Sequence, residues 1–94
     1  MKRCIRITVY GTVQGVGYRE YVQKHASKFN VEGTIQNAED GSVLIYAAGE
    51  ADSLDDLIDY VYQGSKQSSV DEVAIEIATN KRDFRGVFRV IGVD

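Results

Sequence analysis

Residues 5–29, IRITVYGTVQGVGYREYVQKHASKF, change their hydrophobic period halfway and so decide how the chain begins to fold. Ile5, Ile7 and Val9 alternate with polar residues, a pattern that predicts a half-buried strand. From about residue 18 the apolar side chains recur at helical spacing. The strand is therefore expected to pass through the glycine-rich stretch GTVQGVGYR, residues 11–19, into a helix.

The rest of the chain continues this alternation of strands and helices. Asn30 is suited to ending the first helix, and Asp40-Gly41 is a strong hairpin-turn signal. A second helix is expected to start from a cap at Asp52 or Ser53 and to stop at Gly64. The predicted strands are residues 5–10, about 31–37, about 42–48, 72–77 and about 86–91, with the turn-like TNKRD, residues 79–83, before the last.

This order of elements predicts the fold class. Strand, helix, strand, strand, helix and strand, with a short extra strand, are typical of an α+β ferredoxin-like split βαβ sandwich. Such a fold has an antiparallel sheet with two helices on one face. A chain of 94 residues can bury one hydrophobic core, so residues 1–94 are expected to form a single domain.

Composition narrows the possible partners. The formal net charge of −3 argues against a nucleic-acid surface, and no apolar run approaches the ~20 residues of a membrane span. One histidine and the single cysteine, Cys4, cannot supply an ordinary zinc site or an internal disulfide. With no signal-peptide pattern, we expect a cytoplasmic protein that binds no metal, membrane or nucleic acid.

The glycine-rich stretch has two interpretations. Between a strand and a helix, unpaired N–H groups converge at the positive end of the helix dipole, where an anion binds readily. Glycines let these groups form a nest, and Arg19 adds a planar fork of donors. Alternatively, Gly11, Gly15 and Gly17 only turn the chain and Arg19 is solvated. The stretch matches neither standard nucleotide-binding glycine motif, so the residues alone leave both open.

The exact sequence of the glycine-rich stretch is more specific than its composition and position. GTVQGVGYR, followed by a helix and then by VEGTIQNAEDGSV, resembles the acylphosphatase family, whose members carry a G-x-V-Q-G-V-G-[FY]-R signature. The likeness covers essentially the whole chain. It implies a monomer that hydrolyses acyl phosphates without a metal or other cofactor, with Arg19 and Asn37 as catalytic residues and Asn37 positioning the attacking water. The phosphate-binding residues that it implies are Gln14, Gly15, Val16, Gly17, Tyr18 and Arg19.

The chain departs from the family pattern near these residues. Thr34-Ile35-Gln36 precedes Asn37 where members often have Trp-Val-Arg, and Ser65 follows Gly64 where members often have proline. From spacing alone, Asn37 would be interpreted as a residue that bonds the backbone of the hairpin turn.

The hydrolysis of an acyl phosphate can be catalysed by this small set of groups. An acyl phosphate releases a carboxylate, whose conjugate acid has a pKa of about 4, so the leaving group needs no proton. The enzyme then supplies mainly positioning and charge stabilisation, and inorganic phosphate and sulfate should compete with the substrate. Two alternatives remain: a non-catalytic anion-sensing or regulatory domain of the same fold, and an RNA-binding ferredoxin-like module suggested faintly by RGVFRV, residues 85–90.

Overall fold

The computed structural model describes residues 2–79 and 83–92, and these form seven elements. Most of the TNKRD stretch lies outside the described residues. The elements are β1 (Arg3–Thr12), α1 (Tyr18–Lys28), β2 (Glu32–Asn37), β3 (Val43–Gly49), α2 (Ala51–Gln63), β4 (Ser69–Ile77) and β5 (Phe88–Val90).

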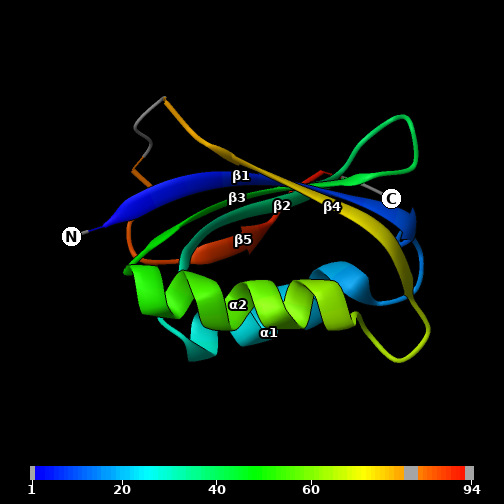
Figure 1. Cartoon of the computed structure of the whole chain (residues 1–94), viewed down its shortest axis with the longest axis horizontal. Coiled ribbons are helices and arrows are strands. Elements are labelled where there is room, and N and C mark those ends of the chain that lie inside the picture. Colours follow the sequence, from blue (N-terminus) through cyan, green and yellow to red (C-terminus); the bar gives the residue numbers. More distant parts are fainter. Residues whose placement is uncertain (1, 80–82, 93–94) are drawn as a thin grey trace.

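The strands form one sheet in the order β4-β1-β3-β2-β5, and both helices cover the same face of it (Figure 1). Pairing is antiparallel between β1 and β3, β1 and β4, and β2 and β3. β5 pairs in parallel with β2, with Gly33 opposite Phe88. The ferredoxin-like α+β prediction is confirmed, although the sheet is mixed because the short last strand runs parallel to its neighbour.

The core lies between the sheet and the two helices. Alternate residues of the strands point toward the helices, and each helix contributes one apolar stripe. Fully or almost fully buried members are Ile7, Val9, Val22, Ala26, Ile35, Val43, Ile45, Leu54, Leu57 and Val61. Because each large aliphatic side chain contributes about 1.5–3 kcal/mol when buried, this pattern fixes which face of each element turns inward.

β1 runs two residues further than the sequence predicts. Its pairing with β4 shifts between Tyr10 and Gly11, so that Gly11 lies inside the strand rather than in the loop. Gly11 has a φ of 133°, and a Cβ there would overlap the carbonyl oxygen of Ser69. This glycine is therefore required by the close approach of β4, and the connection to α1, which we call the glycine loop, consists of residues 13–17.

The start of α2 also corrects the sequence analysis. The helix begins at Ala51 with Glu50 as its N-cap, and the Glu50 side chain does not cap the N–H groups of the first turn. The Glu50 carbonyl instead accepts the N–H of Leu54 at 2.9 Å. Asp52 and Ser53 lie inside the helix, so the prediction that one of them caps it is wrong.

The ends of other helices and strands lie closer to the positions that the sequence predicts. Gly64 is the C-cap of α2, and Asn30 follows the C-cap of α1 with a left-handed φ of 60°, as their residue types predicted. β4 begins three residues early, at Ser69, because it pairs with the extension of β1 at Thr12. β5 is shorter than predicted.

The β2–β3 turn is built around the Asp40-Gly41 pair. The N–H of Ala38 donates to the Ser42 carbonyl at 2.9 Å, and the N–H of Ser42 donates to Asp40 Oδ1 at 3.0 Å. Hydrogen bonds from Ser42 hold the pKa of the Asp40 carboxyl below its usual value. In Figure 1 this turn lies at the same end of the molecule as the glycine loop.

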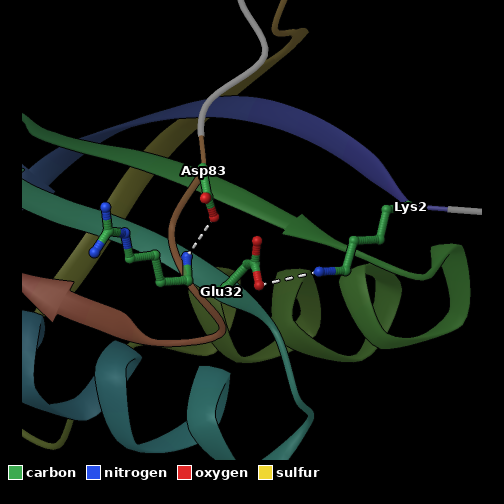
Figure 2. Close-up of polar contacts among 4 residues, drawn as sticks. Lys2, Glu32 and Asp83 are labelled. Atoms are coloured by element: carbon green, nitrogen blue, oxygen red, sulfur yellow. Dashed lines mark hydrogen bonds and ion pairs between the residues drawn. The ribbon is translucent and has the colours of Figure 1, made fainter.

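The opposite end is held by polar contacts of a different kind. Figure 2 shows Lys2 Nζ paired with Glu32 Oε2 at 3.0 Å, ahead of β1 and at the start of β2. Asp83 accepts the backbone N–H of Arg85 at 2.9 Å, where the chain turns toward β5 (Figure 2). An exposed ion pair contributes at most about 1 kcal/mol, so these contacts stabilise the fold only weakly and locally.

Candidate active site

The glycine loop delivers the chain from β1 into α1 through two left-handed residues. Gly15 has a φ of 71°, and Gly17, the N-cap of α1, has a φ of 73°. A Cβ at either position would meet no atom within 4 Å, so it is the backbone conformation that favours glycine. Gly17 has no side chain to cap the helix, which leaves the first-turn N–H groups directed at the space before α1.

A pocket of about 240 Å³ opens at this point, lined by Val13, Gly15, Gly17, Tyr18, Arg19 and Glu20. It brings together most of the residues predicted to bind phosphate. Asn37 comes from the end of β2 and lies outside this lining.

The Arg19 side chain is nearly buried despite its charge. It is only 8% exposed, and its Nη1 donates to the carbonyl oxygen of Ile91, just beyond β5, at 3.4 Å. This contact corrects the interpretation of Arg19 as a solvated surface side chain. The position in the first turn of α1 puts the guanidinium beside the positive end of the helix, where an anion would be doubly favoured.

The Gln14 side chain does not point into the pocket but crosses to the β2–β3 turn. Its Nε2 donates to the carbonyl oxygens of Ala38 and Ser42, each at 2.8 Å. Only the backbone N–H of Gln14 is then suited to an anion. The side chain fastens the glycine loop to the residue that follows Asn37.

Tyr18 lines the pocket, and its side chain extends into the core. The ring is buried in the core, and its hydroxyl donates to the Val61 carbonyl at 2.9 Å. That carbonyl lies near the end of α2, where helix carbonyls need partners from outside the helix. Burial, with a smaller contribution from Tyr21, raises the pKa of the Tyr18 phenol well above its ordinary value.

Asn37 ends β2 opposite Val43, and its side chain is half-buried. Because side chains alternate along a strand, Asn37 shares the helix-covered face with Ile35, which is fully buried. Arg19 lies in the first turn of α1, which covers that same face. Asn37 and Arg19 therefore approach the same end of the sandwich from different layers.

Ser65 contributes a contact that sequence reasoning missed. Its hydroxyl donates to the Val16 carbonyl at 3.2 Å, so a residue noted only as a departure from the family pattern touches the glycine loop. The only available signal was its position directly after the helix stop at Gly64.

Two further properties concern the described residues only. Residues 2–79 and 83–92 contain no group of three or more His, Cys, Asp or Glu side chains arranged to hold a metal ion. No helix formed by these residues has the length and apolar character needed to cross a bilayer.

Known proteins resemble this chain in both sequence and structure. A family model described as acylphosphatase matches residues 5–90. A curated acylphosphatase from Staphylococcus haemolyticus is 43% identical over 79 residues, covering 83% of this chain and 88% of that relative. An acylphosphatase structure from Coxiella burnetii superposes with a TM-score of 0.88 at 37% identity, covering 96% of this chain and 93% of the other. One from Bacillus subtilis gives 0.90 at 33% identity, covering 98% and 100%.

Proposed function

This chain belongs to the acylphosphatase family, and from that premise we propose that it hydrolyses the carboxyl–phosphate anhydride bond of acyl phosphates to a carboxylate and inorganic phosphate. The observation that carries the proposal is the pocket at the start of α1. There two left-handed glycines and the nearly buried Arg19 line one hollow.

The phosphoryl group is bound by the backbone of residues 14–19 together with the guanidinium. Residues in alternating left- and right-handed conformations direct successive N–H groups inward, which suits a tetrahedral anion. A guanidinium carries five donors in a planar fork, so one nitrogen can hold the Ile91 carbonyl while others meet phosphoryl oxygens. We infer that these groups meet the anion in both the substrate and the transition state.

Asn37 orients the attacking water. Its amide offers both donors and an acceptor, so it can hold a water in line with the bond to the leaving carboxylate. The Gln14 tether to Ala38 sets the distance between the end of β2 and the glycine loop. We therefore assign Asn37 to the water and residues 14–19 to the phosphoryl group.

The leaving group explains why this set is sufficient. A carboxylate with a conjugate-acid pKa of about 4 departs without a proton, whereas the alkoxide of a phosphate monoester requires an acid or a metal ion. The donors of the glycine loop and Arg19 supply the charge stabilisation. We propose that the reaction needs no metal and acts poorly on monoesters.

Several related proposals rest on the same site. Inorganic phosphate and sulfate should compete with substrate, because the pocket recognises the tetrahedral anion. We further infer that residues 1–94 act as one domain and as a monomer in the cytoplasm, a setting that suits a chain with a single cysteine, Cys4.

The deciding experiment is an assay of the purified chain with benzoyl phosphate, with glycerol phosphate as the monoester comparison. We expect hydrolysis of benzoyl phosphate in excess EDTA, little action on glycerol phosphate, and competitive inhibition by phosphate. Arg19→Ala should abolish the activity. Phosphate binding without turnover would favour the anion-sensing alternative, and loss of activity in EDTA with recovery on adding Mg²⁺ would refute the metal-free mechanism.

A further inference from the structure

The connection between α2 and β4 touches the glycine loop through one side chain. The Ser65 hydroxyl donates to the carbonyl oxygen of Val16 at 3.2 Å. In Figure 1 this connection lies at the same end of the molecule as the glycine loop. We propose that Ser65 is a positioning residue for anion binding, which holds the Val16–Gly17 peptide so that the Gly17 N–H faces the phosphoryl group. The proposal rests on the function proposed above.

Peptide geometry links the two groups. The carbonyl of Val16 and the N–H of Gly17 belong to one planar trans peptide and point in opposite directions. A carbonyl fixed toward Ser65 therefore directs the Gly17 N–H away from the α2–β4 connection. Gly17 lines the pocket, so this is the direction in which the N–H can meet an anion.

The glycine loop needs such a contact because its own backbone is permissive. Val16 stands between Gly15 and Gly17, and both glycines have a φ near 70° with open space where a Cβ would lie. Glycine adopts left- and right-handed conformations with similar ease, so the peptide between them can rotate at low cost. Rotation would present the Val16 carbonyl to the pocket and repel the phosphoryl oxygens.

Ser65 is itself firmly placed. Its carbonyl accepts the backbone N–H of Ser68 at 3.1 Å and the Ser68 hydroxyl at 3.0 Å, which closes a turn after α2. The preceding Gly64 donates its N–H to Tyr60 at 3.0 Å. The end of α2 is also bonded to α1 by the Tyr18 hydroxyl. The contact therefore connects the Val16–Gly17 peptide of the glycine loop to a helix end that is itself held by hydrogen bonds.

The test compares three variants. Ser65→Ala removes the hydroxyl, Ser65→Thr keeps it, and Ser69→Ala removes an exposed hydroxyl four residues further along as a matched control. Phosphate affinity is measured from amide chemical shifts in NMR titrations. KM and kcat are measured by steady-state kinetics with benzoyl phosphate. Thermal unfolding confirms that each variant is folded.

We expect Ser65→Ala to raise the phosphate Kd and the KM together by about 2- to 10-fold, the range of one hydrogen bond, while kcat changes less. The Gly17 amide should lose most of its phosphate-induced shift. Ser65→Thr should behave as the unchanged chain, as should Ser69→Ala. An unchanged Kd and Gly17 response in Ser65→Ala would overturn the positioning role but leave the proposed function intact. A parent chain with neither phosphate response at residues 14–19 nor hydrolysis would overturn both.

Discussion

Replacing Gln14 with alanine separates the two halves of the proposed site while leaving the backbone N–H of residue 14 in place. The variant loses two hydrogen bonds of 2.8 Å to Ala38 and Ser42. Both carbonyls keep a second donor, since Ala38 accepts the N–H of Gly41 at 3.2 Å and Ser42 accepts that of Ala38 at 2.9 Å. Neither is left unsatisfied, so each lost bond costs an ordinary 0.5–1.5 kcal/mol, or about 1–3 kcal/mol together.

The effect on catalysis should be selective. With the tether gone, the end of β2 can move relative to the glycine loop, and a misplacement of about 1 Å can reduce a rate by about 100-fold. We expect kcat to fall by about 10- to 100-fold while the phosphate Kd stays within about twofold, because the anion meets the backbone and Arg19. On the same preparation, steady-state kinetics give kcat, phosphate titration gives Kd, and chemical denaturation gives the free energy of unfolding.

A matched control is available in α1. Gln23 Nε2 donates to the carbonyl of Phe88 at 3.0 Å, a partly buried bond of the same type that fastens β5 instead of the hairpin. Gln23→Ala should lose about 0.5–1.5 kcal/mol of stability with little loss of turnover. A Gln14→Ala protein that is destabilised but keeps full kcat would refute the idea that this tether positions Asn37. Equal losses of kcat in both variants would refute it too.

Three other expectations follow from the same structure. Asn37→Ala should lower kcat by about 100-fold or more, the scale of one positioned polar group, and phosphate titration should still show binding. Arg19→Lys keeps a charge but loses the planar fork, so both KM and kcat should remain severely impaired in the benzoyl phosphate assay. Burial, and then the charges of Lys24 and Lys28, lower the pKa of His25, so the unfolded chain binds its proton more readily. Stability should therefore fall as pH drops through about 6.5, and His25→Phe should flatten the dependence of Tm on pH in that range.

Local patterns were sufficient for most of the fold. The two-residue period of β1, the helical period after Tyr18 and the Asp40-Gly41 turn each depend on side chains close together in sequence. Each element is present at the expected place in the chain, although β1 is longer than predicted. The cap of α2 was not predictable in this way. Glu50 caps the helix through its carbonyl alone, so no side-chain signature marks the position.

Features that depend on distant segments escaped the sequence analysis. Gly11 is needed because β4 approaches it, and a glycine beside a glycine-rich loop gives no sign of a partner so far along the chain. The tether made by the Gln14 side chain, and the contact of Ser65 with Val16, likewise join loops that only the assembled sheet and helices bring together. The glycines and Arg19 belong to a recognisable sequence motif. The residues that hold them in place belong to no such motif.

The position of β1 between β4 and β3 has a consequence for the kinetics of folding. β1 pairs with β3 and β4, both far along the chain, so folding must close two long loops before these contacts repay their entropy. Until then the glycine loop has no fixed start, and Arg19 cannot meet Ile91 before β5 has docked beside β2. We therefore expect the anion pocket to be completed after the rate-limiting step of folding. Phosphate in the buffer should leave the rate of refolding unchanged and slow only the rate of unfolding.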